Sequence, residues 1–360
     1  MPKFFEVFCK KDQLDEIKSS LSEGTCPLSN SICDGGGNRH QTKLRQADID
    51  TINNLGVKSI GADIPAICSI DYGDEAWIVC PRRLLAFSKG GDGVKRWLKN
   101  HERYILLNAG FNQGQKIAIF SEVYLKYNDG ESDINYHFDY VAFPIIECDL
   151  TLDEFMSRYE VNDRAVSIKA RNILFAEGTQ SIDNKKSCNR QALDFSTFSI
   201  LEVMTASTSG SNSSKGTDIK SAYLKMLAGH EYECPGINKR QVWGRMTTQL
   251  FAKTAIAEEW GGRTYWVVQD QLLKNIEKTT KLDLKDNYPP QSGTVNFISL
   301  FYNNKNDMNL EIKDIYAIPS GLNNNSMGAC TDILLPKIIP SRADFIKAVT
   351  RSQLTAIVEL

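Results

Sequence analysis

Runs of β-branched and aromatic residues from about position 116 onward constrain the fold of this chain most strongly. Such residues favour the pleated, half-buried environment of a sheet. Between two of the runs, Val242, Met246 and Leu250 recur at helical spacing, and the helix is expected to stop at Gly261. We therefore expect an α/β fold of mixed α and β elements around a mixed sheet. The strand-type runs are KIAIFSEVYLKY, INYHFDYVAFPI, FSILEVM, TYWVVQ, GTVNFISLFY and DIYAIPS.

Composition excludes two broad classes of protein. The 360 residues include 42 Lys and Arg against 44 Asp and Glu, a net charge of −2, which excludes a wholly basic protein that coats DNA. No apolar run reaches the roughly 18 residues of a membrane span, and no secretion signal is recognisable. With 42% hydrophobic and 24% charged residues, we expect a globular protein of one or two domains in the cytoplasm.

The cysteines point to a metal rather than to disulfides. There are nine, an odd number in a chain without a recognisable secretion signal, so reduced thiols are expected. Thiolates bind zinc or iron in fours, and the irregular, glycine-containing segment from Thr25 to Thr42 would need such a cross-link. The usual two-residue gaps between paired cysteines are missing, so four unrelated buried thiols are the alternative. The candidates are Cys26, Cys33, Cys68 and Cys80.

Two acids interrupt otherwise apolar strands. Asp139 lies in INYHFDYVAFPI and Glu202 in FSILEVM. Acids are rarely buried without a partner or a metal, and Mg²⁺ typically takes one or two carboxylates plus phosphate oxygens. The pair is a candidate magnesium site, and a salt bridge or an acid on an edge strand is the alternative. His137 is expected on the same strand face as Asp139.

The near-neutral net charge of the whole chain hides two locally basic stretches. Residues 81–103 contain seven Lys or Arg and two acids, and residues 235–257 contain four basic residues and no acid. A one-sided basic surface suits the phosphates of DNA, although a solvated face is the common alternative. The Ser-rich segment 205–217 is either a flexible connection or a groove-contacting loop. The candidate DNA contacts are Arg82, Arg83, Lys95, Arg96, Ser209, Ser211, Asn212, Lys239, Arg240 and Arg245.

Several motifs together resemble the NotI-like type II restriction endonucleases. The order of the cysteines is similar to that in the four-cysteine metal site at the N-terminus of that family. Here GTCP is followed by Cys33, then by a cysteine that opens a hairpin, and then by WIVCP. HFDYVAF resembles the strand with its metal-binding aspartate, ILEVMTASTSGS resembles its ExQ strand and loop, and NKRQVWGRMTTQLFAK resembles a later helix. The similarity covers about residues 20–275 and is weak over 149–195.

The resemblance implies a fold, a reaction and partners. The fold would be a PD-(D/E)XK nuclease core over 82–360, preceded by a metal-binding region over 1–81. Asp139 and Glu202 would bind catalytic Mg²⁺, and the four cysteines would hold structural iron or zinc. The implied function is cleavage of double-stranded DNA by a bacterial, cytoplasmic homodimer, with a cognate DNA methyltransferase as genetic partner.

One position departs from the family pattern. The family has Gln, and the wider fold often Lys, two residues after the glutamate, where this chain has Met204. A thioether cannot orient water in that way. The missing polar group could come from Thr205, Lys220 or Gln180. Alternatively, the metal-binding acid could be Glu177, with Thr179 or Gln180 as the polar residue beside it. Of the two acids, Glu202 fits the family pattern better. A DNA-binding protein that has lost catalysis is the alternative function.

Overall fold

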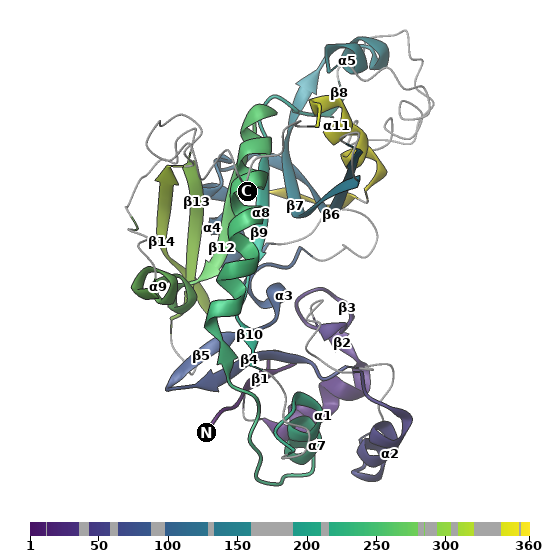
Figure 1. Cartoon of the computed structure of the whole chain (residues 1–360). Coiled ribbons are helices and arrows are strands. Elements are labelled where there is room, and N and C mark those ends of the chain that lie inside the picture. Colours follow the sequence, from purple (N-terminus) through teal and green to yellow (C-terminus); the bar gives the residue numbers. More distant parts are fainter. Residues whose placement is uncertain are drawn as a thin grey trace.

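A large mixed sheet flanked by helices forms the centre of the molecule in this computed structural model (Figure 1). The structure describes residues 1–11, 13–35, 43–57, 64–87, 98–128, 133–159, 190–209, 216–279, 284, 294–303, 309–319, 340–352 and 354–360. The strand order is β14-β13-β12-β9-β7-β6-β15, and β8 pairs with β7. The strands are β6 (Lys116–Asn128), β7 (Asp133–Cys148), β8 (Arg190–Leu193), β9 (Ser199–Met204), β12 (Arg263–Gln269), β13 (Thr294–Tyr302), β14 (Leu310–Pro319) and β15 (Leu354–Glu359).

The centre of this sheet is parallel and its flanks are antiparallel. Strand β12 runs parallel to both β9 and β13, whereas β7, β6, β15 and β14 each join antiparallel. The two parallel partners are buried on both faces, as parallel strands usually are. Along β12, Tyr265 and Val267 point to one face and Trp266 and Val268 to the other.

Helices cover both faces. Helix α8 (Lys239–Glu259) runs across the front in Figure 1 and, with α9 (Asp270–Thr279), packs on the face of Trp266 and Val268. Helices α3 (Pro81–Leu84) and α4 (Asn100–Asn108) pack on the opposite face. Helix α11 (Arg342–Arg351) packs on β6 and β7, where Phe345 stacks on Trp260 with ring centroids 4.3 Å apart.

A second, smaller unit contains the N-terminal region. Its three-stranded sheet has the order β1-β4-β5, and its apolar core continues into residues far along the chain, including Tyr223 and Ile237. The elements are β1 (Lys3–Val7), α1 (Leu14–Glu23), β2 (Thr25–Cys26), β3 (Ser31–Ile32), α2 (Gln46–Asn54), β4 (Ile67–Tyr72), β5 (Glu75–Ile78), β10 (Ser207–Thr208), α7 (Ile219–Leu227) and β11 (Ile237–Asn238). The remaining helix, α5 (Leu152–Arg158), follows β7.

A buried polar network joins the two sheets. Glu6 on β1 is fully buried and accepts hydrogen bonds from Arg83 Nε (3.0 Å), Ser69 Oγ (2.7 Å) and Tyr302 Oη (2.7 Å). Tyr302 ends β13 of the large sheet, so the carboxylate of Glu6 ties the N-terminal sheet to it. A buried charge paired in this way needs every one of these partners.

The structure confirms the expected mixed α/β architecture and most of the expected elements. Every strand-type run forms a strand, and the helical pattern of Val242, Met246 and Leu250 forms α8. Strand β15, which follows α11, was not predicted from the sequence. Among the described residues, no helix is long and apolar enough to cross a membrane.

Candidate functional site

The site forms where two strands of the large sheet separate. Strands β7 and β9 pair from Ala142 and Ser199 to Tyr140 and Leu201. The next residues beyond this ladder are Asp139 and Glu202, and here the backbone N–H of Val203 donates instead to Asp139 Oδ2 at 2.8 Å. The end of the ladder therefore sets the two predicted acids side by side.

Glu202 is paired with a lysine that the sequence analysis did not assign to the site. Lys253 on α8 donates from Nζ to Glu202 Oε2 at 2.6 Å, and both side chains are buried. Among the described residues, Glu202 Oε1 has no hydrogen-bond partner. Burial raises the pKa of Glu202 to about 8, against the opposing effect of the Lys253 charge.

Asp139 shares this environment. Burial raises its pKa, while the nearby Lys253 charge and the Val203 N–H act in the opposite direction. Both acids and the lysine line a cavity of about 510 Å³. Polar and aromatic side chains complete the wall: Asn135, Tyr136, His137, Gln249 and Trp266.

An ion pair stands at the rim of this cavity. His137 lies on the same side of β7 as Asp139, as predicted, and its Nε2 is 2.5 Å from Glu122 Oε2. This hydrogen bond raises the pKa of His137 and lowers that of Glu122. Glu122 has a positive φ of 53° and stands opposite Asp139 on β6. Left-handed backbone in a non-glycine residue is strained and is often found at functional sites.

Met204 does not take part in the site. Its side chain is 1% exposed and packs in the core with Val268 and Leu272. Of the suggested substitutes, Lys220 pairs with Asp48 at 3.2 Å in the N-terminal unit. Glu177, Thr179 and Gln180 lie outside the described residues. Lys253 is instead the polar side chain that contacts Glu202. Its only signal in the sequence was its membership of the acid-free stretch 235–257.

The predicted cysteine ligands lie in one region as two groups. The thiol of Cys33 donates a hydrogen bond to Cys26, which lowers the pKa of Cys26 to about 5. Cys68 is buried against Cys9, which is not one of the four candidates, with Sγ atoms 3.7 Å apart. Burial raises the pKa of Cys80 to about 12. Among the described residues, no three His, Cys, Asp or Glu side chains converge closely enough to form a metal site.

The candidate DNA contacts have diverse surroundings. Arg82 is partly exposed and pairs with Asp34 at 2.7 Å, Lys239 lies 4.3 Å from the ring centroid of Trp77, and Ser209 donates its N–H to Gly236 at 2.7 Å. Lys95, Arg96, Ser211 and Asn212 lie outside the described residues, as do the side chains of Arg240 and Arg245 on α8.

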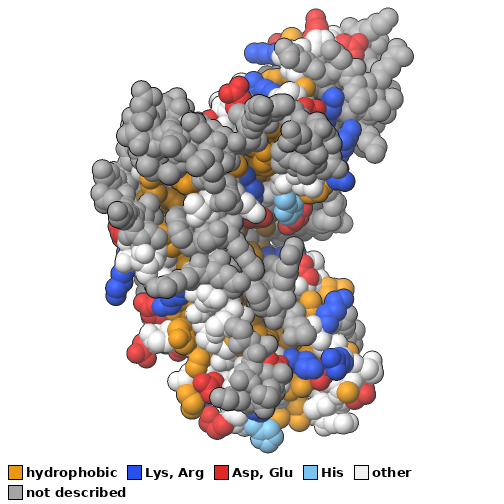
Figure 2. Space-filling view, in the orientation of Figure 1, with side chains coloured by type: hydrophobic (Ala, Val, Ile, Leu, Met, Phe, Trp, Pro, Cys, Tyr) orange, Lys and Arg blue, Asp and Glu red, His pale blue; other side chains and the backbone are white. Residues whose placement is uncertain are grey.

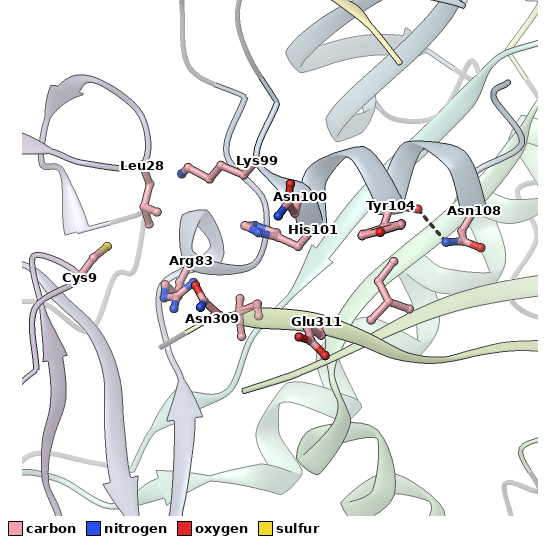
Figure 3. A pocket seen from close by; sticks show the side chains of 12 residues that line it. Cys9, Leu28, Arg83, Lys99, Asn100, His101, Tyr104, Asn108, Asn309 and Glu311 are labelled. Atoms are coloured by element: carbon pink, nitrogen blue, oxygen red, sulfur yellow. Dashed lines mark hydrogen bonds between the residues drawn. The ribbon is translucent and has the colours of Figure 1, made fainter. Parts of the chain in front are cut away.

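Arg83 faces a second cavity while it is held by Glu6. This cavity of about 840 Å³ lies between the cysteine segment, α4 and the start of β14 (Figure 3). Cys9 and Leu28 stand on one wall, and Lys99 and His101 stand on another. Because Arg83 is only 6% exposed and its guanidinium is committed to Glu6, its position is that of a structural ion pair.

Comparison with known proteins gives no assignment. No family model matches the chain, and no curated protein is significantly similar to it.

Proposed function

We propose that this protein is a sequence-specific type II restriction endonuclease of the PD-(D/E)XK class, which hydrolyses phosphodiesters of double-stranded DNA. The observation that carries the proposal is the convergence of Asp139, Glu202 and Lys253 in one cavity. Two carboxylates can bind a divalent cation, and a lysine beside them can bind a phosphate at the same place. The motifs resembling the NotI-like family supply the reaction class.

The donor set fits Mg²⁺. Asp139 and Glu202 present carboxylate oxygens, and Oε1 of Glu202 has no partner within the described part of the chain. Held by these two acids, Mg²⁺ would neutralise charge on the scissile phosphate and lower the pKa of a bound water. The remaining ligands of magnesium are commonly waters and phosphate oxygens, so two protein carboxylates are sufficient.

The chain's own residues orient these groups. The N–H of Val203 fixes the Asp139 carboxylate, and Lys253 fixes that of Glu202. The ammonium of Lys253 also places a positive charge where a phosphorane would develop negative charge. Water oxygen forms the new bond to phosphorus, one phosphorus–oxygen ester bond breaks, the water proton leaves to solvent, and the departing oxygen takes a proton from solvent.

The position of the cavity suits a DNA duplex. Figure 2 shows a recess between the part of the molecule around β6 and β7 and the N-terminal unit, with histidine and acidic side chains at its upper edge. We propose that DNA lies in this recess with Arg82 and Lys239 near its backbone. A homodimer would read a palindromic site, and a cognate DNA methyltransferase would protect the host sequence.

We also propose that Cys26, Cys33, Cys68 and Cys80 hold one structural iron or zinc ion. Four thiols in one region support this, and thiolate donors suit either metal. Elemental analysis of the purified protein checks it. We expect about one iron or zinc per chain, falling in a Cys80→Ser variant. A wild-type protein without either metal would refute this part alone.

The nuclease proposal is tested by incubating the purified protein with plasmid and genomic DNA and Mg²⁺. We expect discrete fragments, and we expect Asp139→Asn and Glu202→Gln to bind DNA without cutting it. DNA that is bound but uncut by the wild type with every divalent cation would instead favour the alternative, a binding protein without catalysis. Glu177→Ala is the control for the alternative site, and loss of cutting in that variant alone would refute Glu202.

A further inference from the structure

Trp266 lines the same cavity, and its indole carries an unsatisfied hydrogen-bond donor. In the parallel ladder of β12 and β9, Trp266 is the direct partner of Glu202, so both side chains stand on the face covered by α8. Trp266 is 1% exposed, and within the described residues its Nε1 has no acceptor. Buried indole N–H groups usually find a partner.

The two orphaned atoms are complementary. Nε1 of Trp266 can only donate, and Oε1 of a Glu202 carboxylate can only accept, yet the two do not bond each other. A phosphate oxygen would satisfy the indole but would be repelled by the carboxylate. A water molecule donates and accepts, so one water between them would satisfy both, and the two side chains line the same cavity of about 510 Å³.

The order of the strands places this water within the proposed site. Strand β9 lies between β12 and β7, so Trp266, Glu202 and Asp139 form a row across the sheet, with Lys253 above Glu202. Met204, which holds the position of the expected Gln or Lys, is packed in the core and offers no donor. Trp266 on β12 and Lys253 on α8 are donors on the two elements that directly flank Glu202.

We propose that the indole N–H of Trp266 donates a hydrogen bond to the water that attacks phosphorus, making Trp266 a catalytic residue. The inference rests on the proposed nuclease function. One lone pair of the water oxygen accepts from Nε1, one O–H points to Glu202 Oε1, and the other lone pair attacks. The hydrogen bond from Nε1 stabilises the negative charge that the oxygen gains as its proton leaves to solvent.

The variant that isolates this donor is Trp266→Phe, which keeps an aromatic ring and removes the N–H. The matched control is Trp260→Phe, because Trp260 is equally buried and its Nε1 donates to the carbonyl of Pro340 at 2.8 Å, outside the cavity. Both variants lose one buried donor. Only one of them loses it in the proposed site.

Single-turnover cleavage with Mg²⁺ and DNA binding with Ca²⁺ measure the effect. For Trp266→Phe we expect the cleavage rate to fall about 10- to 100-fold, DNA affinity to stay within about twofold, and the pH–rate profile to move to higher pH. Trp260→Phe should cleave within about twofold of wild type once folded. Wild-type rate and pH profile in Trp266→Phe would overturn the proposal and leave the nuclease function standing.

A second measurement does not depend on activity or on the variant's stability. In ¹⁵N-tryptophan-labelled wild-type protein, the indole resonance of Trp266 is expected to show cross-relaxation with water and to shift on addition of Mg²⁺. The Trp260 resonance should do neither. A Trp266 resonance without water contact would overturn the inference. If the protein cut no DNA while the Trp266 indole still contacted water, the nuclease function would be refuted. The role of Trp266 in the attack on phosphorus would be refuted with it.

Discussion

At the scale of single residues, Lys253 is the contact on which the candidate site depends. Its ammonium is the partner of Glu202 Oε2 at 2.6 Å, and both groups are almost entirely buried. Removing one member of a buried ion pair leaves an uncompensated charge, which protein interiors tolerate poorly. Lys253 therefore contributes to the proposed chemistry and also opposes the rise in the pKa of Glu202 that burial causes.

We expect Lys253→Met to reduce cleavage by about 100-fold or more, since the ammonium aimed at the phosphate is lost. DNA binding in Ca²⁺ should change little. Single-turnover cleavage and a filter-binding titration measure the two effects. Lys274→Met on α9 is the control, because Lys274 is half exposed and pairs with Asp270 away from the cavity. Unchanged cleavage in Lys253→Met would show that the ion pair is structural.

The raised pKa of Glu202 predicts a pH-dependent stability. The folded protein holds a proton on Glu202 up to about pH 8, whereas the unfolded chain loses it near the ordinary value of 4.5. Between these values the folded state binds the extra proton, so the free energy of unfolding falls as pH rises, by up to about 1.4 kcal/mol per pH unit.

This trend is measured by urea unfolding between pH 5 and 8 in the presence of EDTA. The double variant Glu202→Gln with Lys253→Met removes both charges and should flatten the dependence. A slope that is identical in the double variant would assign the effect to other groups.

At the scale of elements, the junction between α8 and β12 sets the geometry of the site. Gly262 donates its N–H to Ala257 at the end of the helix, and Arg263 then bonds to Phe198 as β12 enters the sheet beside β9. A helix that ended later would move Lys253 and Trp266 relative to Glu202. A Cβ on Gly262 would lie 2.4 Å from the ring of Phe198.

Gly262→Ala is therefore expected to destabilise the protein by about 1–3 kcal/mol, because either the ring or the strand must shift. Chemical unfolding measures this cost. Phe198→Leu provides the matched test: in the double variant the alanine should cost less than it does alone, since the obstructing ring is gone. Strict additivity of the two changes would contradict the clash.

Elements were more predictable from the sequence than the site. Periodicity was sufficient for β6, β7, β9 and α8, because their apolar faces are long and regular. Asp139 and Glu202 were noticeable because acids are unusual in apolar strands. Lys253 and Trp266 were not, since a lysine and a tryptophan on such elements are ordinary. Lys253 reaches Glu202 only because α8 packs over β9, and Trp266 reaches it only because β12 pairs with β9.

At the scale of the whole molecule, the Glu6 network holds the N-terminal unit against the large sheet. Arg83, Tyr302 and Ser69 reach Glu6 from α3, β13 and β4, so four elements meet at one carboxylate. The recess proposed for DNA lies between the parts that this network joins (Figure 2). Its width therefore depends on a polar contact far from the candidate catalytic cavity.

We expect Arg83→Met to lower the free energy of unfolding by about 3–5 kcal/mol, because Glu6 would be buried without its counter-ion. Arg82→Met is the neighbouring control. Its partly exposed pair with Asp34 should be worth no more than about 1 kcal/mol. Urea unfolding of both variants measures the difference, and equal costs would show that Glu6 is not the critical partner.

The bond between Tyr302 and Glu6 also has a kinetic consequence. It joins residues 296 positions apart, whereas β6 and β7 pair from Asn128 and Asp133, which are near neighbours in the sequence. Contacts across long loops form slowly, since chain entropy must be lost before they contribute. Refolding should therefore build the central strands first and dock the N-terminal sheet onto them last, so that the candidate carboxylates are in place before the recess proposed for DNA is complete.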